Sequence, residues 1–201
     1  MIRVLLADDQ ALLRSAFAAL LALEDDLTVV GQVGSGDQVV AEALRTRPDV
    51  ALLDVQMPGV DGLTAAAALR AALPSCRAII LTTFGRPGYL RRAMEAGAAG
   101  FLVKDVPAEQ LVDAIRRVHA GLRVVDPVLA AETLTLGTSP FTERERDVLV
   151  AAADGGTVAD IARRLHLSEG TVRNHLSSVI GKTEARTRAE AVRVATERGW
   201  L

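Results

Sequence analysis

Three acidic side chains follow two short apolar runs that have the character of buried strands. Asp8 and Asp9 come directly after the run that ends at Ala7, and Asp54 ends the run at residues 50–54. Carboxylates about 4–5 Å apart repel by roughly 3–4 kcal/mol per pair at an effective dielectric near 20. A raised pKa or a bound cation relieves that repulsion. Because Mg²⁺ prefers oxygen ligands and keeps positions for water and phosphate oxygens, these acids predict a Mg²⁺ site. A carboxylate there is placed to act as a nucleophile toward a phosphoryl group.

Two further polar residues end strand-like runs later in the chain, Thr82 and Lys104. We expect Lys104 to neutralise charge on the oxygens of a transferred phosphoryl group, and the Thr82 hydroxyl to donate to one of them. An Asp after a strand is also a common turn former or helix cap, which is the alternative for each acid taken alone. Five polar residues at strand ends together favour a pocket that accepts a phosphoryl group.

The elements that position these residues alternate regularly over the first 120 residues. Strands are predicted at residues 4–7, 29–33, 50–54, 78–82 and 100–103. Helices are predicted at residues 11–23, 37–47, 63–73, 89–96 and 107–121. Five repeats of strand then helix indicate an α/β domain with a doubly wound, five-stranded parallel sheet of the flavodoxin-like kind. In such a sheet the first, third and fourth strands are neighbours, so their carboxyl ends meet at the switch point.

The last third of the chain has a different pattern, in which every periodic segment is helical. Residues 121–139 carry loop chemistry and are predicted to be a linker, although 127–136 has the pattern of a short helix. A capping box of Thr142 and Glu145 starts the first helix of the tail. The remaining helices are predicted at residues 158–165, 168–183 and 188–198. Residues 140–201 therefore indicate a second, all-α domain of four helices.

Two of these helices have the spacing of a helix-turn-helix, with a tight turn at residues 166–167. Such modules place the second helix in the major groove of DNA. Arg173, Asn174 and Ser177 have groove-facing spacing, and Arg favours guanine while Asn favours adenine. Thr171 and Lys182 are better placed for phosphates. The alternative is a solvated polar face on a small bundle, because helix-turn-helix spacing alone has false positives.

Charge supports DNA binding only locally. The chain of 201 residues has a formal net charge of −2, whereas residues 163–188 hold six Lys or Arg and two acids. We therefore expect modest, salt-sensitive affinity for DNA of any sequence. His175 is interpreted as a packing or phosphate contact and not a metal ligand, because no His or Cys lies at ligand spacing from it.

The remaining composition excludes several classes of protein. Cys76 is the single cysteine, so neither an internal disulfide nor a Cys-based metal cluster is possible. No run approaches the roughly 18 apolar residues of a membrane span, and the first residues do not have the pattern of a signal peptide. We expect a cytoplasmic protein.

The polar residues at the strand ends, with the turn after the third strand, resemble the receiver domain of two-component response regulators. The matching residues are Asp8, Asp9, Asp54, Met57, Pro58, Gly59, Thr82 and Lys104. The resemblance covers residues 1–120 and implies that Asp54 accepts phosphate from the phosphohistidine of a sensor histidine kinase. It implies that Asp9, Asp54 and the backbone carbonyl of Gln56 hold Mg²⁺, with Asp8 acting mainly through water.

The same resemblance assigns a switch pair, Thr82 and Phe101, which moves when phosphate arrives. The family often has Tyr at the aromatic position. Because Phe101 has no hydroxyl, a switch here depends on ring packing and not on a new hydrogen bond. The alternative for Phe101 is an ordinary core aromatic.

Residues 140–201 resemble the four-helix DNA-binding domain of LuxR-type transcription factors. The match rests on residues 141–145 and 168–176, although the family usually has Leu where Phe141 stands. A receiver followed by this domain resembles the NarL/FixJ group of response regulators. Residues 81–89 and 199–201 also resemble a DesR-type subgroup whose sensor kinase is membrane-bound. Base-contacting positions vary among members, so the operator sequence does not follow.

The main hypothesis is a transcriptional response regulator and not an enzyme. Phosphorylation of Asp54 is expected to favour a homodimer, through the first and fifth helices or the fourth and fifth, that binds two half-sites of a double-stranded DNA operator. An activator of this kind would also contact RNA polymerase.

Two other classes stay open at this point. One is a Mg²⁺-dependent phosphatase with an aspartyl-phosphate intermediate, although such enzymes usually place the nucleophile and a second Asp two apart on the first strand. The other is a constitutive DNA-binding protein whose receiver only dimerises.

Overall fold

The computed structural model describes residues 1–83, 87–126, 130–131 and 139–201. The chain divides into two compact units, with the main boundary between Ala130 and Ala131. The short helix predicted at residues 127–136 falls almost wholly outside the described residues, as does the middle of the segment at 81–89. Among the described residues, no helix combines the length and the apolar character needed to cross a membrane.

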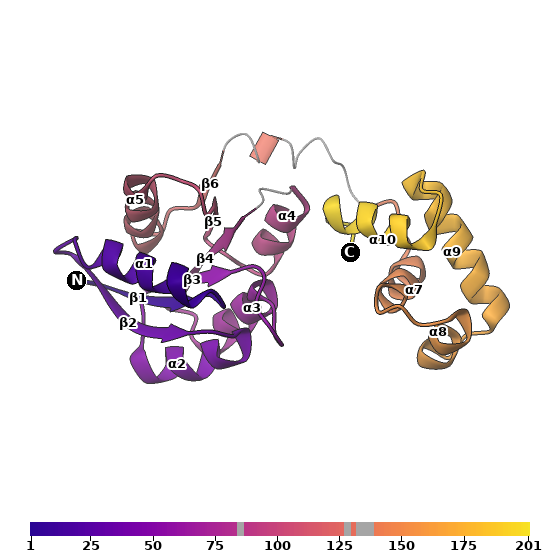
Figure 1. Cartoon of the computed structure of the whole chain (residues 1–201), viewed down its shortest axis with the longest axis horizontal. Coiled ribbons are helices and arrows are strands. Elements are labelled where there is room, and N and C mark those ends of the chain that lie inside the picture. The colour runs from indigo at the N-terminus through magenta and orange to yellow at the C-terminus, as the bar shows by residue number, and fades with distance from the viewer. Residues whose placement is uncertain (84–86, 127–129, 132–138) are drawn as a thin grey trace. The chain divides into compact units, whose positions relative to one another are not determined.

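The first unit is built on a parallel sheet whose strand order is β2-β1-β3-β4-β5-β6 (Figure 1). The strands are β1 (Ile2–Ala7), β2 (Leu27–Val33), β3 (Val50–Asp54), β4 (Arg77–Thr82), β5 (Gly100–Val103) and β6 (Val124–Val125). The predicted doubly wound parallel sheet is confirmed, but the predicted count of five strands is wrong. β6 adds a sixth strand by pairing Val124 with Gly100 and Val125 with Phe101. Two residues are too short to show a period in the sequence, so the sequence pattern places them in the predicted linker.

Helices cover both faces of the sheet, with α1 and α5 on one face and α2, α3 and α4 on the other (Figure 1). They are α1 (Ala11–Leu21), α2 (Val39–Thr46), α3 (Gly62–Ala72), α4 (Pro87–Glu95) and α5 (Ala108–His119). A short 3₁₀ turn, η1 (Gly36–Gln38), precedes α2 where the sequence predicted a continuous helix. At Gly36 a Cβ would lie 2.0 Å from the carbonyl oxygen of Val60, so this turn packs directly against the loop after β3.

Successive residues of each strand enter different cores because strand side chains alternate between faces. Leu6, Leu52 and Ile79 pack with Ile115 of α5 in the core under α1 and α5. Apolar strand residues at the intervening positions are fully buried as well, among them Leu5, Leu53, Ile80 and Phe101. Burial on both faces explains why β3 is a continuous apolar run up to its final aspartate.

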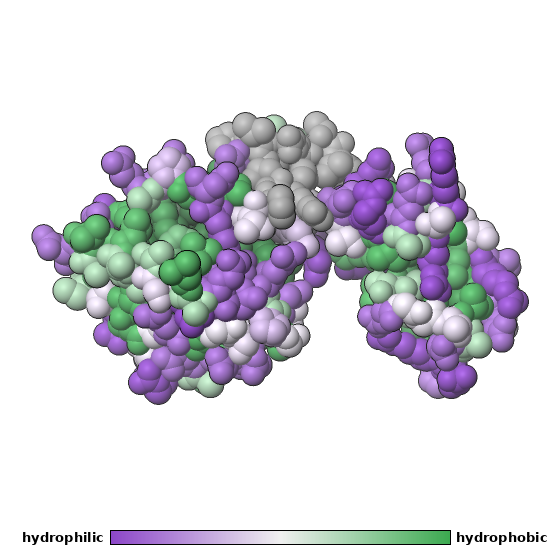
Figure 2. Space-filling model, in the orientation of Figure 1, coloured by the Kyte–Doolittle hydropathy of each residue, from purple (hydrophilic) through white to green (hydrophobic). Residues whose placement is uncertain are grey.

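The outer surface of α1 is apolar (Figure 2). Leu12 is 86% exposed and Leu23 is 82% exposed. The other exposed positions over residues 11–23 are Ala or Ser, so none of the exposed residues on this face is charged. We name the exposed residues of this segment the α1 face; they are Ala11, Leu12, Ser15, Ala16, Ala19, Ala22 and Leu23.

The second unit contains the four helices predicted for the tail. They are α7 (Glu143–Ala153), α8 (Val158–Leu165), α9 (Glu169–Thr183) and α10 (Arg188–Glu197). The predicted capping box of Thr142 and Glu145 is confirmed, and a second one at the start of α8, Thr157 with Asp160, was not predicted. His166 adopts φ 54° in the turn between α8 and α9, where Ser168 caps α9. The core shared by α7, α8 and α9 contains Ile161, Leu165, Leu167, Val172 and Leu176.

Candidate functional site

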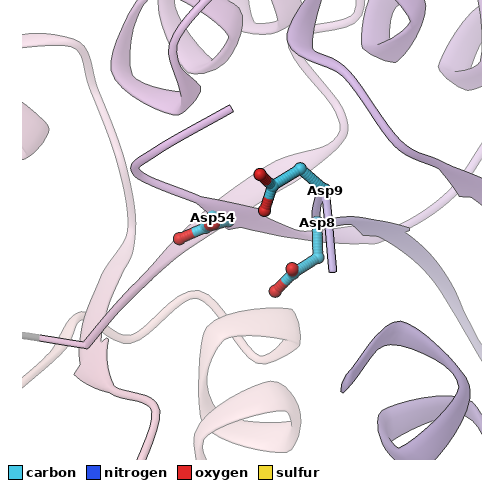
Figure 3. Close-up of side chains that lie close together, drawn as sticks. All are labelled: Asp8, Asp9 and Asp54. Carbon is cyan, nitrogen blue, oxygen red and sulfur yellow. The ribbon is translucent and has the colours of Figure 1, made fainter. Parts of the chain in front are cut away.

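Three carboxylates meet at the carboxyl ends of β1 and β3. Asp8 and Asp9 follow β1, and Asp54 is the last residue of β3, which pairs directly with β1. Figure 3 shows their side chains converging, and one oxygen of each lies within 4.8 Å of the others. Asp8 is 3% and Asp54 is 4% exposed, whereas Asp9 is exposed to solvent. The structure therefore brings together the three acids that the sequence singled out.

Lys104 places a cation between the two buried acids. Its Nζ lies 2.7 Å from Oδ2 of Asp8 and 3.1 Å from Oδ1 of Asp54. Burial raises the pKa of Asp54 above its ordinary value; the Lys104 ammonium opposes that rise and the charge of Asp8 adds to it. One ammonium does not balance three carboxylates, so the pocket keeps an excess of negative charge. Such an all-oxygen donor set with surplus negative charge fits a divalent cation.

The loop after β1 is held by hydrogen bonds to the backbone N–H, the carbonyl oxygen and Oδ1 of Asp8. Its N–H donates to the carbonyl of Val33 at 3.2 Å, and its Oδ1 accepts from the N–H of Gln10 at 2.9 Å. The Arg14 guanidinium donates to its carbonyl oxygen at 2.5 Å. Sequence reasoning missed Arg14, because one Arg in a helical pattern carries no sign of its partner.

The loop after β3 is held by tight backbone packing. The N–H of Gly62 donates to the carbonyl of Val55 at 3.0 Å. Asp61 caps α3, since its Oδ1 accepts from the N–H of Thr64 at 2.7 Å. Gln56, whose carbonyl is the predicted fourth metal ligand, lies exposed in this loop two residues after Asp54.

The predicted switch pair lies on the neighbouring strands. Thr82 ends β4 and is 4% exposed, and its carbonyl accepts from the N–H of Lys104 at 2.7 Å. Phe101 on β5 is fully buried and stands opposite Ile80 of β4. Thr82 and Lys104 are therefore linked through the backbone at the edge of the acidic pocket, and any movement of the Phe101 ring changes core packing.

The second unit presents the predicted DNA-contacting residues along α9. Arg173, Asn174 and Ser177 are exposed, whereas Thr171 and His175 are half-buried. The Arg173 guanidinium lies 2.6 Å from the Glu169 carboxylate one turn earlier. Lys182, predicted as a phosphate contact, lies 2.6 Å from Glu145 of α7. Sequence reasoning recognised Glu145 only as a capping residue, because a partner 37 residues away in the chain leaves no local pattern.

The fold and the pocket define a class of protein: an α/β domain with an acidic pocket at its strand ends, joined to a helix-turn-helix domain. Residues 4–116 match the response regulator receiver domain, and residues 139–195 match the luxR family of bacterial regulatory proteins. The chain belongs to the two-component response regulators with a LuxR-type DNA-binding domain, as the sequence motifs predicted.

Curated relatives of this chain are described as transcriptional regulators. The chain is 44% identical over 201 residues to the transcriptional regulatory protein DesR of Bacillus subtilis, with 100% of both chains covered. It is 34% identical over 206 residues to the DNA-binding transcriptional activator DevR/DosR of Mycobacterium tuberculosis, covering 98% of this chain and 95% of that protein. The prediction of a DNA-binding transcriptional regulator is thus confirmed.

Solved structures agree with the fold. The response regulator ChrA of a heme-sensing two-component system matches with a TM-score of 0.58 and 31% identity, covering 100% of this chain and 98% of that one. The structure titled as a complex of the response regulator RcsB with DNA matches with a TM-score of 0.69, 22% identity and 98% coverage of both chains. The second likeness supports the architecture alone.

Proposed function

We propose that this regulator is switched by transfer of a phosphoryl group from a sensor histidine kinase to Asp54. The observation that carries the proposal is the meeting of Asp8, Asp9 and Asp54 around the Lys104 ammonium. An Asp54 oxygen forms the new bond to phosphorus, the bond between phosphorus and the kinase imidazole breaks, and the imidazole leaves. Asp9, Asp54 and the Gln56 carbonyl are the ligands we assign to Mg²⁺, with Asp8 acting through water. Bound there, the ion supplies positive charge to the phosphoryl oxygens.

Lys104 and Thr82 take defined parts in this proposal. Because Lys104 also contacts Asp8, its ammonium stays at the pocket when the charge on Asp54 changes. The ammonium is then placed to neutralise one phosphoryl oxygen. The Thr82 hydroxyl is placed to donate a hydrogen bond to another phosphoryl oxygen. The backbone bond between these two residues ties the end of β4 to the residue that follows β5, the strand that contains Phe101. Phe101 follows by repacking, since its ring has no hydroxyl.

The α1 face supports a homodimer as the product of this switch. Uncharged exposed surfaces on soluble proteins frequently mark contacts with other chains. Leu12 on this face lies four residues after Asp8, so a change in the pocket lies close to it in the chain. Of the two surfaces left open by the sequence, we therefore favour the one that includes α1. Moving a conformational equilibrium from 1% to 99% active needs about 5.5 kcal/mol, which the phosphoryl group and the dimer interface must supply together.

Dimerisation then brings two copies of α9 to two half-sites, about one helical turn of DNA apart. Arg173, Asn174 and Ser177 are the residues we assign to base edges, and Thr171 and His175 to the backbone. Each half-site alone is bound weakly, so the pairing of two domains sets the operator affinity.

Three measurements on the full chain test the proposal. Intact-mass spectrometry after incubation with acetyl phosphate and Mg²⁺ is expected to show one added phosphoryl group, absent from Asp54→Asn. Analytical ultracentrifugation is expected to show a dimer with beryllofluoride and Mg²⁺. Mapping of occupied genomic sites supplies the operator, whose affinity should rise on phosphorylation. An unmodified wild type, or operator affinity indifferent to Asp54→Ala, would contradict the proposed switch.

A further inference from the structure

Glu145 connects the start of α7 to the DNA-binding helix. Its side chain is 7% exposed, and both carboxylate oxygens are bonded. Oε2 accepts from the N–H of Thr142 at 2.7 Å and from the Nζ of Lys182 at 2.6 Å. Oε1 accepts from the hydroxyl of Ser178 at 2.6 Å. A single buried carboxylate therefore holds two successive turns of one face of α9.

This pair differs from the other ion pairs around α8 and α9. The pair of Arg173 and Glu169 has 62% and 50% of its side chains exposed, and that of Arg163 and Asp160 has 78% and 52%. Exposed pairs contribute little stability, so a DNA phosphate can replace the carboxylate partner of either Arg. Removing Lys182 from Glu145 instead leaves a buried carboxylate without its counter-ion, which is far more costly.

The ionisation state of Glu145 also distinguishes its pair with Lys182 from the exposed ion pairs. Burial raises the pKa of this carboxyl, but the hydrogen bonds from Lys182, Ser178 and Thr142 outweigh it and hold the pKa at about 2. The carboxylate is thus charged at any physiological pH. Lys182 meets a full negative charge within its own domain before any DNA is present.

We propose that Glu145 withholds Lys182 from the DNA backbone, so that this cation fixes α9 against α7 and is not available to pair with a phosphate. The inference rests on the DNA binding described under the proposed function, and it replaces the sequence-based expectation that Lys182 contacts phosphate. Affinity for DNA of any sequence is consequently lower than the number of cations near α9 suggests. Glu145 is a positioning residue that acts on DNA through Lys182.

The test is the salt dependence of binding to a duplex of arbitrary sequence, which needs no known operator. Each phosphate neutralised adds about 0.9 to the slope of log affinity against log salt concentration. Fluorescence anisotropy with the full chain between roughly 50 and 200 mM salt measures this slope. The variants are Lys182→Gln, Glu145→Gln and the double substitution; Gln at 182 can still donate to Glu145.

We expect Lys182→Gln to leave the slope as in wild type, because the wild-type ammonium does not displace counterions. Glu145→Gln releases Lys182, so we expect the slope to steepen by about 0.9 and affinity at low salt to rise roughly 3- to 10-fold. The double variant should return to the wild-type slope. A slope about 0.9 shallower in Lys182→Gln, or unchanged in Glu145→Gln, overturns the inference.

Glu169→Gln is the matched control, because it removes the same unit of charge from an exposed pair on α9. Since Arg173 already exchanges partners on DNA, this variant should change the slope by less than half as much as Glu145→Gln. Equal changes would indicate a general charge effect and overturn the inference.

Fluorescence of Trp200, the one tryptophan of the chain, monitors unfolding of each variant. If Glu145→Gln does not fold, the slope of Lys182→Gln decides alone. Wild-type protein that binds no duplex would contradict the proposed DNA binding as well.

Discussion

A Cβ on Gly62 would lie 1.9 Å from the backbone carbonyl oxygen of Asp54. No real Cβ approaches an oxygen that closely, so the loop after β3 folds back onto the last residue of that strand only because Gly62 has no side chain. The backbone of Asp54, the residue we propose as phosphoacceptor, is thereby fixed in place by a residue eight positions later. This contact is independent of the charges in the pocket.

Gly62→Ala should therefore move the backbone at Asp54 and weaken both phosphorylation and stability. Forcing extra atoms into close packing usually costs about 1–3 kcal/mol. We expect a loss of receiver stability of that order in urea unfolding, and a slower gain of phosphoryl mass with acetyl phosphate. Gly34→Ala is the control, because its Cβ would meet Arg14 at an ordinary 3.6 Å. Equal phosphorylation rates in Gly62→Ala and wild type would show that the contact does not position Asp54.

Asp54→Asn is expected to stabilise the receiver while abolishing phosphorylation. Burial raises the pKa of Asp54, so the charged form is disfavoured in the folded state. At neutral pH the substitution removes that penalty together with repulsion from Asp8, so the free energy of unfolding should rise. Because the folded pKa lies above the unfolded one, the gain should shrink as the pH falls through the folded value and be lost below the unfolded value.

Thermal unfolding followed by circular dichroism measures this gain, and added Mg²⁺ should raise the wild-type midpoint more than that of Asp54→Asn. Asp25→Asn, at an exposed acid before β2, serves as the control. It should change neither the unfolding midpoint nor the rise in that midpoint with Mg²⁺. A wild-type midpoint that does not respond to Mg²⁺ would count against the metal site assigned to these acids.

The sequence was sufficient for the sheet and its carboxyl-end acids because both follow from local pattern and one topological rule. Apolar runs ended at Asp54 and Thr82 as predicted, and the parallel order then placed those ends together. β1 and β2 start two residues earlier than predicted, because Ile2 and Leu27 pair with each other. A charged residue next to each, Arg3 and Asp26, obscured that start in the apolar pattern.

Individual side-chain contacts could not be predicted in the same way. The bond from Arg14 to the Asp8 carbonyl depends on a side-chain rotamer that no periodicity encodes. The bridge from Glu145 to Lys182 joins helices whose relative rotation is set by packing. The sequence supplied the right residue types at both places, but their partners required coordinates.

Glu145 should also make the DNA-binding domain sensitive to acid. Its pKa is about 2 when folded, against an ordinary value of 4.5. A lowered folded pKa means that the stabilisation is complete above pH 4.5 and is lost as the pH falls toward 2. Unfolding midpoints from Trp200 fluorescence should fall over this range in wild type. The difference between wild type and Glu145→Gln should shrink across the same range, on the order of 3 kcal/mol in total. A difference independent of pH would show that the carboxylate charge is not the stabilising feature.

Leu12→Glu should disrupt the dimer without unfolding the receiver. Leu12 is 86% exposed, so the substitution buries no charge in the monomer. We expect the thermal midpoint to stay within about 2 °C, because exposed substitutions rarely exceed 0.5 kcal/mol. Two facing glutamates on an apolar interface should reduce dimer affinity at least about tenfold. Sedimentation with beryllofluoride measures this, and Leu44→Glu on α2, where Leu44 is 42% exposed, is the control. Equal dimerisation of both variants would exclude the α1 face.

Gly181→Ala should stabilise the DNA-binding domain and weaken its binding to DNA. Gly181 is an exposed residue inside α9, and no described heavy atom lies within 4 Å of where its Cβ would be. A glycine inside a helix costs about 0.5–1 kcal/mol relative to alanine, so the Trp200-monitored midpoint should rise by about 3–6 °C.

The glycine has no steric reason among the described residues, and on the proposed DNA-binding helix the missing side chain would allow a close approach of DNA. Gly181 is four residues after Ser177 and seven after Asn174, so the three lie on one side of α9. We expect operator affinity to fall about 3- to 10-fold, as for a contact worth roughly 1 kcal/mol. Gly156→Ala, between α7 and α8, is the control, since its Cβ would meet only Asp160 at 3.5 Å. A stabilised Gly181→Ala protein with undiminished operator affinity would show that the DNA does not pass close to this turn of α9.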